Sequence, residues 1–401
     1  TEKGRFFMER KLSVNTLAVH AGARRDDAFG AINTPVYMTS NYRIPTDGTP
    51  VDWSGINSNI YQRNRNVNQM VLQDRLCALA GAEDGAVFAS GVAALMSVFT
   101  TFLNSGDHAV VSEVCYSATN LQFREFLPKK YGIQVTFVDI TDAEAVRRAV
   151  RPNTKLIHAE TPGNPTTGIA DLDALARIAH EAGALLSVDA TFAGPICLRP
   201  LEHGADLEIH SMTKYINGHG DSLGGCVLGR RELLTKIKEE AMVNYGGILS
   251  PFNAWLVARG LATAPLRMAQ HCRAAQAVAE FLERSPAVRF IWYPGLASHP
   301  QHELAKRLMG GQYSGMISFD IKGDERVHQK FLDSLRLITH AVSLGDIESL
   351  IVYYDKNSDK LPHYPPVYRE GFFRFSVGLE DPADLIADLQ QALEASGALS
   401  A

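Results

Sequence analysis

Apolar positions along the chain follow two alternating patterns from about residue 70 onward. Segments 71–80 and 172–182 have apolar residues at helical spacing and predict amphipathic helices. Short uninterrupted apolar runs separate such segments, at 109–114, 135–140, 156–160 and 185–190. Strand-like runs that alternate with helices are typical of a parallel sheet with crossover helices, and uninterrupted apolar strands suit a sheet buried on both faces. We therefore predict an α/β domain with a large, mostly parallel sheet.

The pattern changes after about residue 250, where one long helical stretch is predicted from 251 to about 284. Separate strand-like runs follow it, at 315–321, 338–344, 349–354 and 372–380. A last amphipathic helix opens with Asp381-Pro382, an N-cap residue followed by a proline that suits the first helical turn. This predicts a smaller C-terminal α+β domain. The expected parts are an N-terminal arm at 1–65, an α/β domain at 66–255 and an α+β domain at 256–401.

The composition is that of a globular chain with a sizeable core, because 46% of its 401 residues are hydrophobic and 21% are charged. Lysine and arginine number 39 and aspartate and glutamate 44, which gives a formal net charge of −5. This mildly acidic balance supplies no basic field for nucleic acid or an anionic membrane. No apolar run reaches the roughly 20 residues that span a bilayer, and residues 1–13 lack the apolar core of a signal peptide.

The five cysteines are scattered and form no CxxC pair, so a disulfide framework or a structural zinc site is not expected. This usage is typical of the reducing cytoplasm, where we expect the protein to reside. The 13 histidines show no HExxH or comparable spacing, and we predict no metal site.

The strongest chemical signal is Lys214, which lies among the hydroxyl residues of Ser211-Met212-Thr213 and precedes a glycine-rich stretch. Ligands of parallel sheets bind beyond the carboxyl ends of the strands, and this motif directly follows a strand-like run. Hydroxyl and backbone N–H groups would hold a phosphate while the amine attacks an aldehyde. The alternative is a solvated loop lysine.

Two further signals are compatible with the same chemistry. Asp189 closes a very apolar run, where a carboxylate is costly unless it is paired. It would suit a pyridinium nitrogen, although an N-cap or a buried ion pair would explain it equally well. Residues 89–94 (ASGVAA) stand between a short apolar run and a helix, where small residues let backbone N–H groups approach a phosphate. An ordinary tight strand-to-helix turn has the same appearance.

Motifs that run almost from end to end of the chain connect these signals. They are TLAVHAG (16–22), TPVYMTSNY (34–42), IYQRNRN (60–66), FASGVAAL (88–95), ETPGNP (160–165), SVDATFAGP (187–195), HSMTKYINGHGDSLGG (210–225), LSPFNAWLVARGLATAPLRM (249–268), AVSLGDIESL (341–350) and RFSVGLED (374–381). In order, spacing and length, the chain resembles the Cys/Met-metabolism family of pyridoxal-phosphate (PLP)-dependent enzymes. That family includes cystathionine γ-synthase, cystathionine β- and γ-lyases, methionine γ-lyase and O-acylhomoserine sulfhydrylases.

The resemblance implies the fold type I of PLP-dependent transferases, with a large sheet domain and a smaller C-terminal domain, and it implies pyridoxal 5′-phosphate as the cofactor. Lys214 would bind the cofactor aldehyde covalently, and Asp189 would pair with its ring nitrogen. The resemblance places the phosphate against Gly91, Val92, Ser211 and Thr213.

The resemblance also assigns residues to the substrate. Tyr116 would stack on the cofactor ring and relay a proton, and Asn164 would lie near the ring hydroxyl and the substrate carboxylate. Arg374 would grip that carboxylate with Ser343 beside it, because a planar guanidinium forms a bidentate clamp.

Tyr61 and Arg63 match a segment that, in this family, reaches the phosphate of a neighbouring subunit. Each active site would then need two chains. The resemblance therefore implies a homo-oligomer with shared active sites, and members of the family are usually tetramers.

Several positions bear on the reaction. Val342 resembles methionine γ-lyases, whereas cystathionine enzymes often carry an acidic residue there. Ser117-Ala118 follow Tyr116, where methionine γ-lyases typically have a cysteine, so methionine specificity is in doubt.

Two segments, 65–68 and 352–357, depart from the family pattern near the substrate entrance of relatives. Tyr353-Tyr354 suggest a leaving group other than methanethiol. The competing explanation is neutral sequence change at a surface segment. A polar or cationic oxygen-linked group, as in canavanine, would have acidic candidate partners in Asp346, Glu348 and Asp355.

We predict a PLP-dependent γ-elimination lyase that acts on a γ-substituted L-amino acid, a small-molecule substrate. The alternative is a γ-replacement transferase, such as an O-acylhomoserine sulfhydrylase or a cystathionine γ-synthase. A third interpretation, a protein that binds PLP without turnover, is disfavoured because Lys214, Asp189, Arg374 and Tyr116 are all present.

Overall fold

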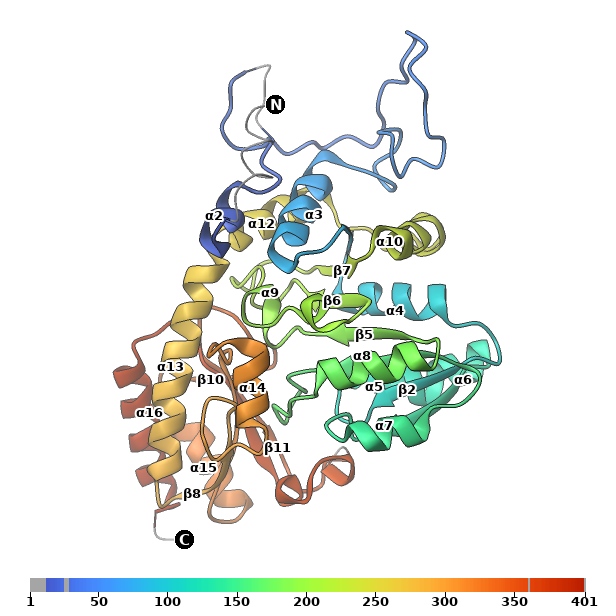
Figure 1. The fold of residues 1–401 in the computed structure, drawn as a ribbon. Coiled ribbons are helices and arrows are strands. Elements are labelled where there is room, and N and C mark those ends of the chain that lie inside the picture. The colour runs from blue at the N-terminus through green and yellow to red at the C-terminus, as the bar shows by residue number, and fades with distance from the viewer. Residues whose placement is uncertain (1–11, 25–28, 360, 400–401) are drawn as a thin grey trace.

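A computed structural model of the chain describes residues 12–24, 29–359 and 361–399. Parts of the predicted arm and of the N-terminal stretch 1–13 therefore lie outside the described residues. The described chain builds two sheets that lie side by side, with helices around them (Figure 1). The strands of the large sheet lie between residues 84 and 229, and those of the small sheet between 288 and 376.

The large sheet has seven strands in the order β1-β7-β6-β5-β4-β2-β3. All of them run in one direction except β7, which is antiparallel to both neighbours, so the predicted mostly parallel sheet is present. The strands are β1 Asp84–Phe88, β2 His108–Ser112, β3 Gln134–Val138, β4 Thr154–Glu160, β5 Leu185–Asp189, β6 Leu207–Ser211 and β7 Gly225–Gly229.

Helices cover both faces of this sheet because its strands are apolar on both sides. In β2, Ala109 and Val111 point into one core and Val110 into the other. The first face is covered by α4 Gly91–Phe102, η1 Gln122–Phe126, α6 Leu127–Tyr131, α10 Arg231–Ile237 and η3 Lys238–Met242. The second face is covered by α7 Ala143–Ala149, α8 Leu172–Glu181, α9 Gly194–Cys197, α2 Val14–His20, α3 Val67–Ala80 and α12 Pro251–Leu261. Short helical segments connect these elements, namely α5 Ser117–Leu121, η2 Pro200–His203 and α11 Val243–Tyr245.

The small sheet has the strand order β10-β11-β12-β9-β8, and only the pair β10–β11 is parallel. Its strands are β8 Val288–Trp292, β9 Met316–Ile321, β10 Thr339–His340, β11 Leu350–Tyr354 and β12 Phe372–Ser376. One apolar core joins this sheet to α13 Ala264–Arg284, α15 Glu325–Ser334 and α16 Pro382–Ser396. The remaining elements of this part are α14 His302–Met309, η4 Leu361–His363 and η5 Pro366–Tyr368. As predicted, Asp381 caps α16 by accepting a hydrogen bond from the Ala383 backbone.

The single long helix predicted from 251 to 284 is wrong, because the structure breaks it into α12 and α13. Thr263 leaves the helical conformation with φ −107° and ψ 2°. Pro265 follows in the first turn of α13. Proline is tolerated there because the first N–H groups of a helix have no hydrogen-bond acceptor within the helix. The predicted domain boundary after residue 255 falls inside α12, and the division into domains stays a prediction.

The strand predicted at 338–344 is also shorter than expected, since only Thr339 and His340 pair as β10. Ser343 has φ 87°, in the left-handed region that a strand cannot contain. The chain therefore turns away from the sheet at this residue. A pattern of apolar residues cannot reveal this turn, because serine is not a residue that usually marks it.

Residues 29–65 of the arm form no helix and make one isolated bridge, between Asn41 and Tyr61. This segment extends away from the sheets in Figure 1. Large apolar side chains on it are mostly exposed, among them Phe29, Met38 and Trp53. Such an apolar, extended segment has little of its own chain to pack against.

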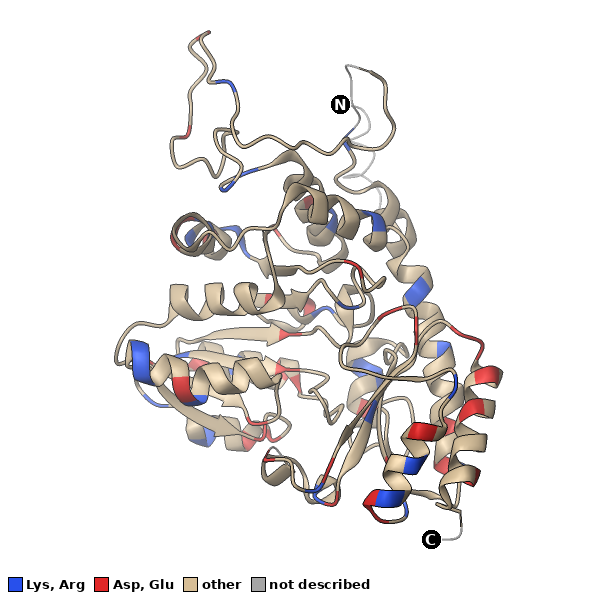
Figure 2. Cartoon of the chain, turned by 180° about the vertical axis from the view of Figure 1, so that it is seen from behind, with Lys and Arg blue, Asp and Glu red and all other residues tan. Residues whose placement is uncertain are grey.

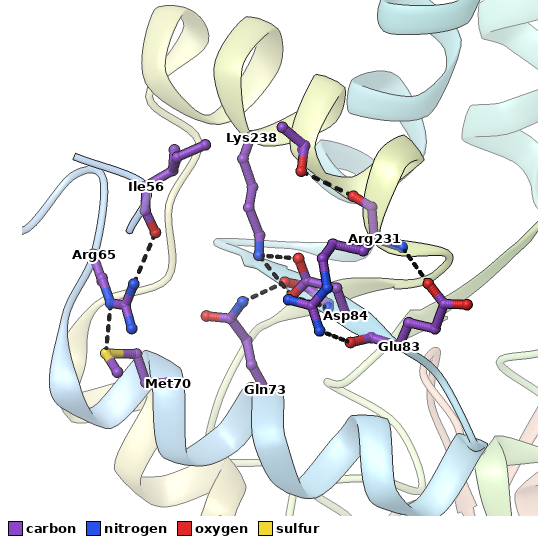
Figure 3. Close-up of polar contacts among 10 residues, drawn as sticks. Ile56, Arg65, Met70, Gln73, Glu83, Asp84, Arg231 and Lys238 are labelled. Atoms are coloured by element: carbon purple, nitrogen blue, oxygen red, sulfur yellow. Dashed lines mark hydrogen bonds and ion pairs between the residues drawn. The ribbon is translucent and has the colours of Figure 1, made fainter. Parts of the chain in front are cut away.

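Side-chain contacts hold the end of the arm and the first strand in place (Figure 3). Arg65 donates to the Ile56 carbonyl at 3.0 Å and to the Met70 sulfur at 3.0 Å, which ties the arm to α3. Lys238 in η3 donates to both carboxylate oxygens of Asp84, each at 2.8 Å. Arg65, part of a segment that departs from the family pattern, thus has a local structural role.

Several helices carry both acidic and basic residues, among them α14 and α15 (Figure 2). The last helix, α16, is an exception, since its charged residues Asp384, Asp388 and Glu394 are all acidic. Over the described ranges, the structure contains no helix that is long and apolar enough to cross a membrane.

Replacing Lys238 with methionine will destabilise the fold, because it leaves the Asp84 carboxylate without its cation. Both side chains are largely buried, with 13% and 19% of their surfaces exposed. We expect the free energy of unfolding of the Lys238→Met variant to fall by about 2 kcal/mol. The measurement is the midpoint temperature of thermal unfolding, which should be lower than that of the wild type. Lys236→Met, an exposed position on α10, is the matched control and should keep the wild-type midpoint. Equal midpoints for the two variants would contradict the role of this ion pair.

Candidate active site

A cavity of about 580 Å³ lies where the carboxyl ends of the large sheet face the small sheet. Ten of the twelve predicted site residues line it, namely Gly91, Val92, Tyr116, Asn164, Asp189, Ser211, Thr213, Lys214, Ser343 and Arg374. The other two, Tyr61 and Arg63, are not among its lining residues. They lie on the arm, where the Arg63 guanidinium stands 5.2 Å from the centre of the Tyr61 ring.

One end of the cavity is suited to an anion. The helix α4 begins at Gly91, and Ser90 caps it by accepting a hydrogen bond from the Ala93 backbone at 3.1 Å. Its first N–H groups form the positive end of the helix dipole. A Cβ atom at Gly91 would lie 2.8 Å from the Cβ of Ser211, so only glycine lets the two segments approach this closely. The hydroxyl groups of Ser211 and Thr213 line the same cavity.

The acidic end is Asp189, the last residue of β5. Thr191 donates to its Oδ1 atom from both the backbone, at 3.0 Å, and the hydroxyl, at 2.6 Å. Burial raises the pKa of Asp189, and the two hydrogen bonds oppose this shift. Thr191 also accepts from the Ser211 backbone at 2.8 Å, which links the acidic end to the anion end. A cationic ring nitrogen in the cavity would favour the charged form of Asp189.

Glu160 is a site residue to which the sequence analysis assigned no role. It ends β4 beside Asp189, and its two oxygens accept from the backbone N–H groups of Tyr116, at 2.7 Å, and Asn164, at 2.8 Å. Burial and the charge of Asp189 hold the pKa of Glu160 well above its usual range. The available signal was a carboxylate at the end of an apolar run, directly before Thr161-Pro162.

Lys214 lies between the two sheets, and its Nζ atom donates to the Ser343 hydroxyl at 2.8 Å. Burial lowers the pKa of Lys214, Asp346 counteracts this effect, and the positive charge of Arg374 adds to it. A larger share of the amine is therefore neutral near pH 7 than for an exposed lysine, as a nucleophile or base requires. Ser343 adopts the left-handed backbone conformation at this contact, and such local strain is common at functional sites.

Arg374 projects into the cavity from β12 of the small sheet. Its guanidinium donates to the Asn164 side-chain oxygen at 3.2 Å and to the Ser343 carbonyl at 2.8 Å. Its Nε atom is buried and has no hydrogen-bond partner among the described residues. A guanidinium that is held in place and still has a free N–H donor is suited to a carboxylate ligand.

The divergent segment 352–357 contributes less to the cavity than expected. Tyr354 lines it, but Tyr353 lies on the opposite side of β11, because side chains alternate along a strand. None of the three acidic candidates is among the lining residues: Asp346 acts on Lys214 through its charge, Glu348 is exposed, and Asp355 follows the end of β11. The interpretation that they face the leaving group is not supported by these positions.

The residues of the cavity fit PLP. A helix N-terminus with hydroxyl groups suits its phosphate, a buried aspartate suits its ring nitrogen, and a lysine with lowered pKa suits its aldehyde. The tight approach of Gly91 to Ser211 forms the cradle that such a phosphate needs.

Residues 15–394 match the family described as "Cys/Met metabolism PLP-dependent enzyme". The chain belongs to this family. PLP is therefore its cofactor, and the cavity described above is the candidate active site of a PLP-dependent enzyme.

Named relatives and a solved structure agree with this assignment. The chain is 50% identical to canavanine γ-lyase of Pseudomonas canavaninivorans and 51% identical to canavanine γ-lyase of Rhizobium leguminosarum bv. trifolii, in both cases over 96% of each chain. It is 41% identical to L-methionine γ-lyase of Porphyromonas gingivalis, over 94% of this chain and 96% of the relative. The crystal structure of metB from Corynebacterium glutamicum superposes with a TM-score of 0.88 at 37% identity, over 96% and 98% of the two chains.

These comparisons confirm the predicted fold class, a type I PLP enzyme with a large α/β part and a smaller α+β part. They also confirm the predicted reaction class, a γ-elimination lyase that cleaves a carbon–heteroatom bond of an amino acid.

Replacing Glu160 with glutamine will impair the active site, because the amide nitrogen of glutamine cannot accept a hydrogen bond. One of the two N–H groups, of Tyr116 or Asn164, then loses its buried acceptor. We expect kcat to fall about tenfold and the thermal midpoint to drop. Glu181→Gln, an exposed change at the end of α8, is the control. A Glu160→Gln enzyme with wild-type kcat would contradict this role.

Proposed function

We propose that this enzyme catalyses the γ-elimination of L-canavanine and releases hydroxyguanidine from its oxygen-linked side chain. The observation that carries the proposal is the sequence identity of 50% and 51%, over 96% of the chain, to two proteins named canavanine γ-lyase. The cavity supports it, since Ser117 lines the wall where methionine γ-lyases typically have a cysteine. Tyr354, which belongs to the divergent segment 352–357, also lines the cavity.

We assign the site residues to roles that fit their contacts. Gly91, Val92, Ser211 and Thr213 hold the phosphate, and Asp189 faces the ring nitrogen. Arg374, positioned by Asn164 and Ser343, binds the substrate carboxylate and thereby orients Cα toward Lys214. When bound, PLP withdraws electrons from Cα of an attached amino acid, which makes the Cα proton acidic.

Lys214 is suited to accept the Cα proton, because burial lowers the pKa of its amine. The Ser343 hydroxyl, 2.8 Å from Nζ, positions the amine. Tyr116, whose backbone is anchored by Glu160, presents a phenol to the cavity. After the Cα proton has been passed on, the Lys214 amine can accept a proton from Cβ, and the electrons of that C–H bond form a Cβ–Cγ double bond as the Cγ–O bond breaks. The Tyr116 phenol can donate a proton to the departing oxygen, so that the leaving group departs as neutral hydroxyguanidine.

We further propose that the enzyme is a homo-oligomer with shared active sites, a homotetramer, and that it works in the cytoplasm. Tyr61 and Arg63 lie outside the cavity of their own chain, on an arm with exposed apolar side chains, as expected if they complete the site of a partner. The five cysteines are free, which suits a reducing compartment.

Product analysis tests the proposed reaction. With L-canavanine, we expect equal amounts of hydroxyguanidine and of a four-carbon product, 2-oxobutanoate with ammonia, or homoserine if water adds at Cγ. We expect kcat/KM for L-canavanine to exceed that for L-methionine at least tenfold, by about the difference that one well-fitted group makes. Lys214→Ala should lose about a thousandfold in kcat, with Lys236→Ala as the control.

Faster turnover of L-methionine or of an O-acylhomoserine than of L-canavanine would overturn the substrate assignment. A new thioether amino acid, formed when thiol is added, would move the enzyme to the γ-replacement branch.

Mixed oligomers test the shared site. Tyr61→Ala chains and Lys214→Ala chains, each nearly inactive alone, should regain about a quarter of the wild-type activity when they are co-expressed. The reason is that half of the dimers are then hybrids, and each hybrid contains one intact site. Activity of the mixture no higher than that of the separate variants would show that each chain forms its site alone. Tyr61→Ala mixed with Tyr61→Ala is the control.

A further inference from the structure

Two residues of the small sheet, Arg374 and Tyr354, line the cavity at a spacing that can be compared with the length of the substrate. Arg374 is the residue that we assign to the substrate carboxylate. Arg374 pairs across the sheet with Val352 of β11, and both line the cavity. Tyr354 is the next residue of β11 on the same face and also lines the cavity. Because a strand rises about 3.3 Å per residue, Tyr354 stands about 7 Å further along the sheet than Arg374.

This spacing matches the length of the proposed substrate. Six bonds separate the carboxylate carbon of L-canavanine from its guanidino carbon. An extended chain covers about 3.5 Å in three bonds, so six bonds span about 7 Å. With the carboxylate at Arg374 and the chain extended along β11, the guanidinooxy group would stand at the level of Tyr354.

The Tyr354 ring is held in a fixed orientation by its neighbour on β12. It stacks on Phe372 with 4.8 Å between ring centres and 2° between ring planes. Phe372 is fully buried, and Tyr364, which also lines the cavity, packs against it edge-on at 6.0 Å. One face of Tyr354 is therefore covered, while the half-buried side chain also lines the cavity.

The charges along the cavity favour an aromatic partner for the leaving group. Among the described residues that line it, the carboxylates are Glu160 and Asp189, and both lie at the ends of large-sheet strands beside the proposed cofactor position. A planar guanidino group, cationic when protonated, is attracted by the face of an aromatic ring.

We propose that Tyr354 is the residue that determines specificity for a planar guanidinooxy leaving group, which it receives against the ring surface that Phe372 leaves open. This inference rests on the proposed function, since it concerns the same site and the same substrate. It adds a residue that recognises the leaving group and is distinct from those that hold the cofactor or the carboxylate.

The chain offers a matched control in the neighbouring residue of the same strand. Tyr353 points to the opposite face, where its hydroxyl donates to Glu325 at 3.0 Å and its ring stacks on His328 at 5.0 Å. A change at Tyr353 removes the same kind of side chain from the same strand without reaching the cavity.

The experiment compares Tyr354→Leu, Tyr354→Met, Tyr354→Phe and Tyr353→Leu in the PLP-loaded enzyme. The first measurement is the ratio of kcat/KM for L-canavanine to that for O-acetyl-L-homoserine, which has a neutral oxygen-linked group. We expect this ratio to fall about tenfold in Tyr354→Leu and Tyr354→Met. It should change less than about twofold in Tyr354→Phe, which keeps the ring, and in Tyr353→Leu.

The second measurement needs no turnover. L-Arginine has a methylene where L-canavanine has its oxygen, at the δ position next to Cγ, so it offers a guanidino group without a leaving heteroatom. We would titrate each ligand and follow the absorbance of the cofactor. The Tyr354→Leu change should raise the Kd for L-arginine about tenfold more than it raises the Kd for L-norleucine. Tyr354→Met provides the same comparison if the leucine variant does not fold.

The outcomes separate the two proposals. If the wild-type enzyme leaves L-canavanine unchanged, the proposed function is wrong, regardless of the results for the Tyr354 variants. A wild-type enzyme that cleaves L-canavanine, together with Tyr354→Leu and Tyr354→Met variants that keep both the kcat/KM ratio and the preference for L-arginine, overturns the role of Tyr354 alone.

Discussion

Two carboxylates buried side by side at the ends of β4 and β5 determine the layout of this active site. Glu160 and Asp189 are cross-strand neighbours, and each needs partners because a buried carboxyl group without hydrogen bonds is costly. Glu160 finds them in the backbones of Tyr116 and Asn164, and Asp189 finds them in Thr191. The loops that carry the catalytic groups are therefore positioned by the need of two acids for hydrogen bonds.

Residues from both sheets are needed to form the cavity. Arg374 reaches across to the Asn164 side chain, and Lys214 reaches back to Ser343. These two contacts join the edges of both sheets around one cavity, so that the group assigned to the carboxylate and the group assigned to the Cα proton are held in one network. A shift of one sheet against the other would disturb both groups together.

Within a family that shares its cofactor chemistry, specificity depends on the part of the cavity that the cofactor does not use. In this chain we assign Tyr354, which lines the cavity and belongs to a segment that departs from the family pattern, to that part. Arg65, which belongs to the other divergent segment, ties the arm to α3. Divergence from a family pattern thus has two different physical meanings in one chain, and only contacts distinguish them.

The sequence by itself determined the mostly parallel sheet, the family and ten residues of the cavity, because apolar periodicity and motif chemistry are local properties. Only the tertiary structure revealed the role of Glu160, the break at Thr263 and the turn at Ser343, since these depend on partners far along the chain or on a backbone conformation that serine rarely adopts. It also separated Tyr353 from Tyr354, because the face that a strand residue occupies depends on how the strand pairs within the sheet.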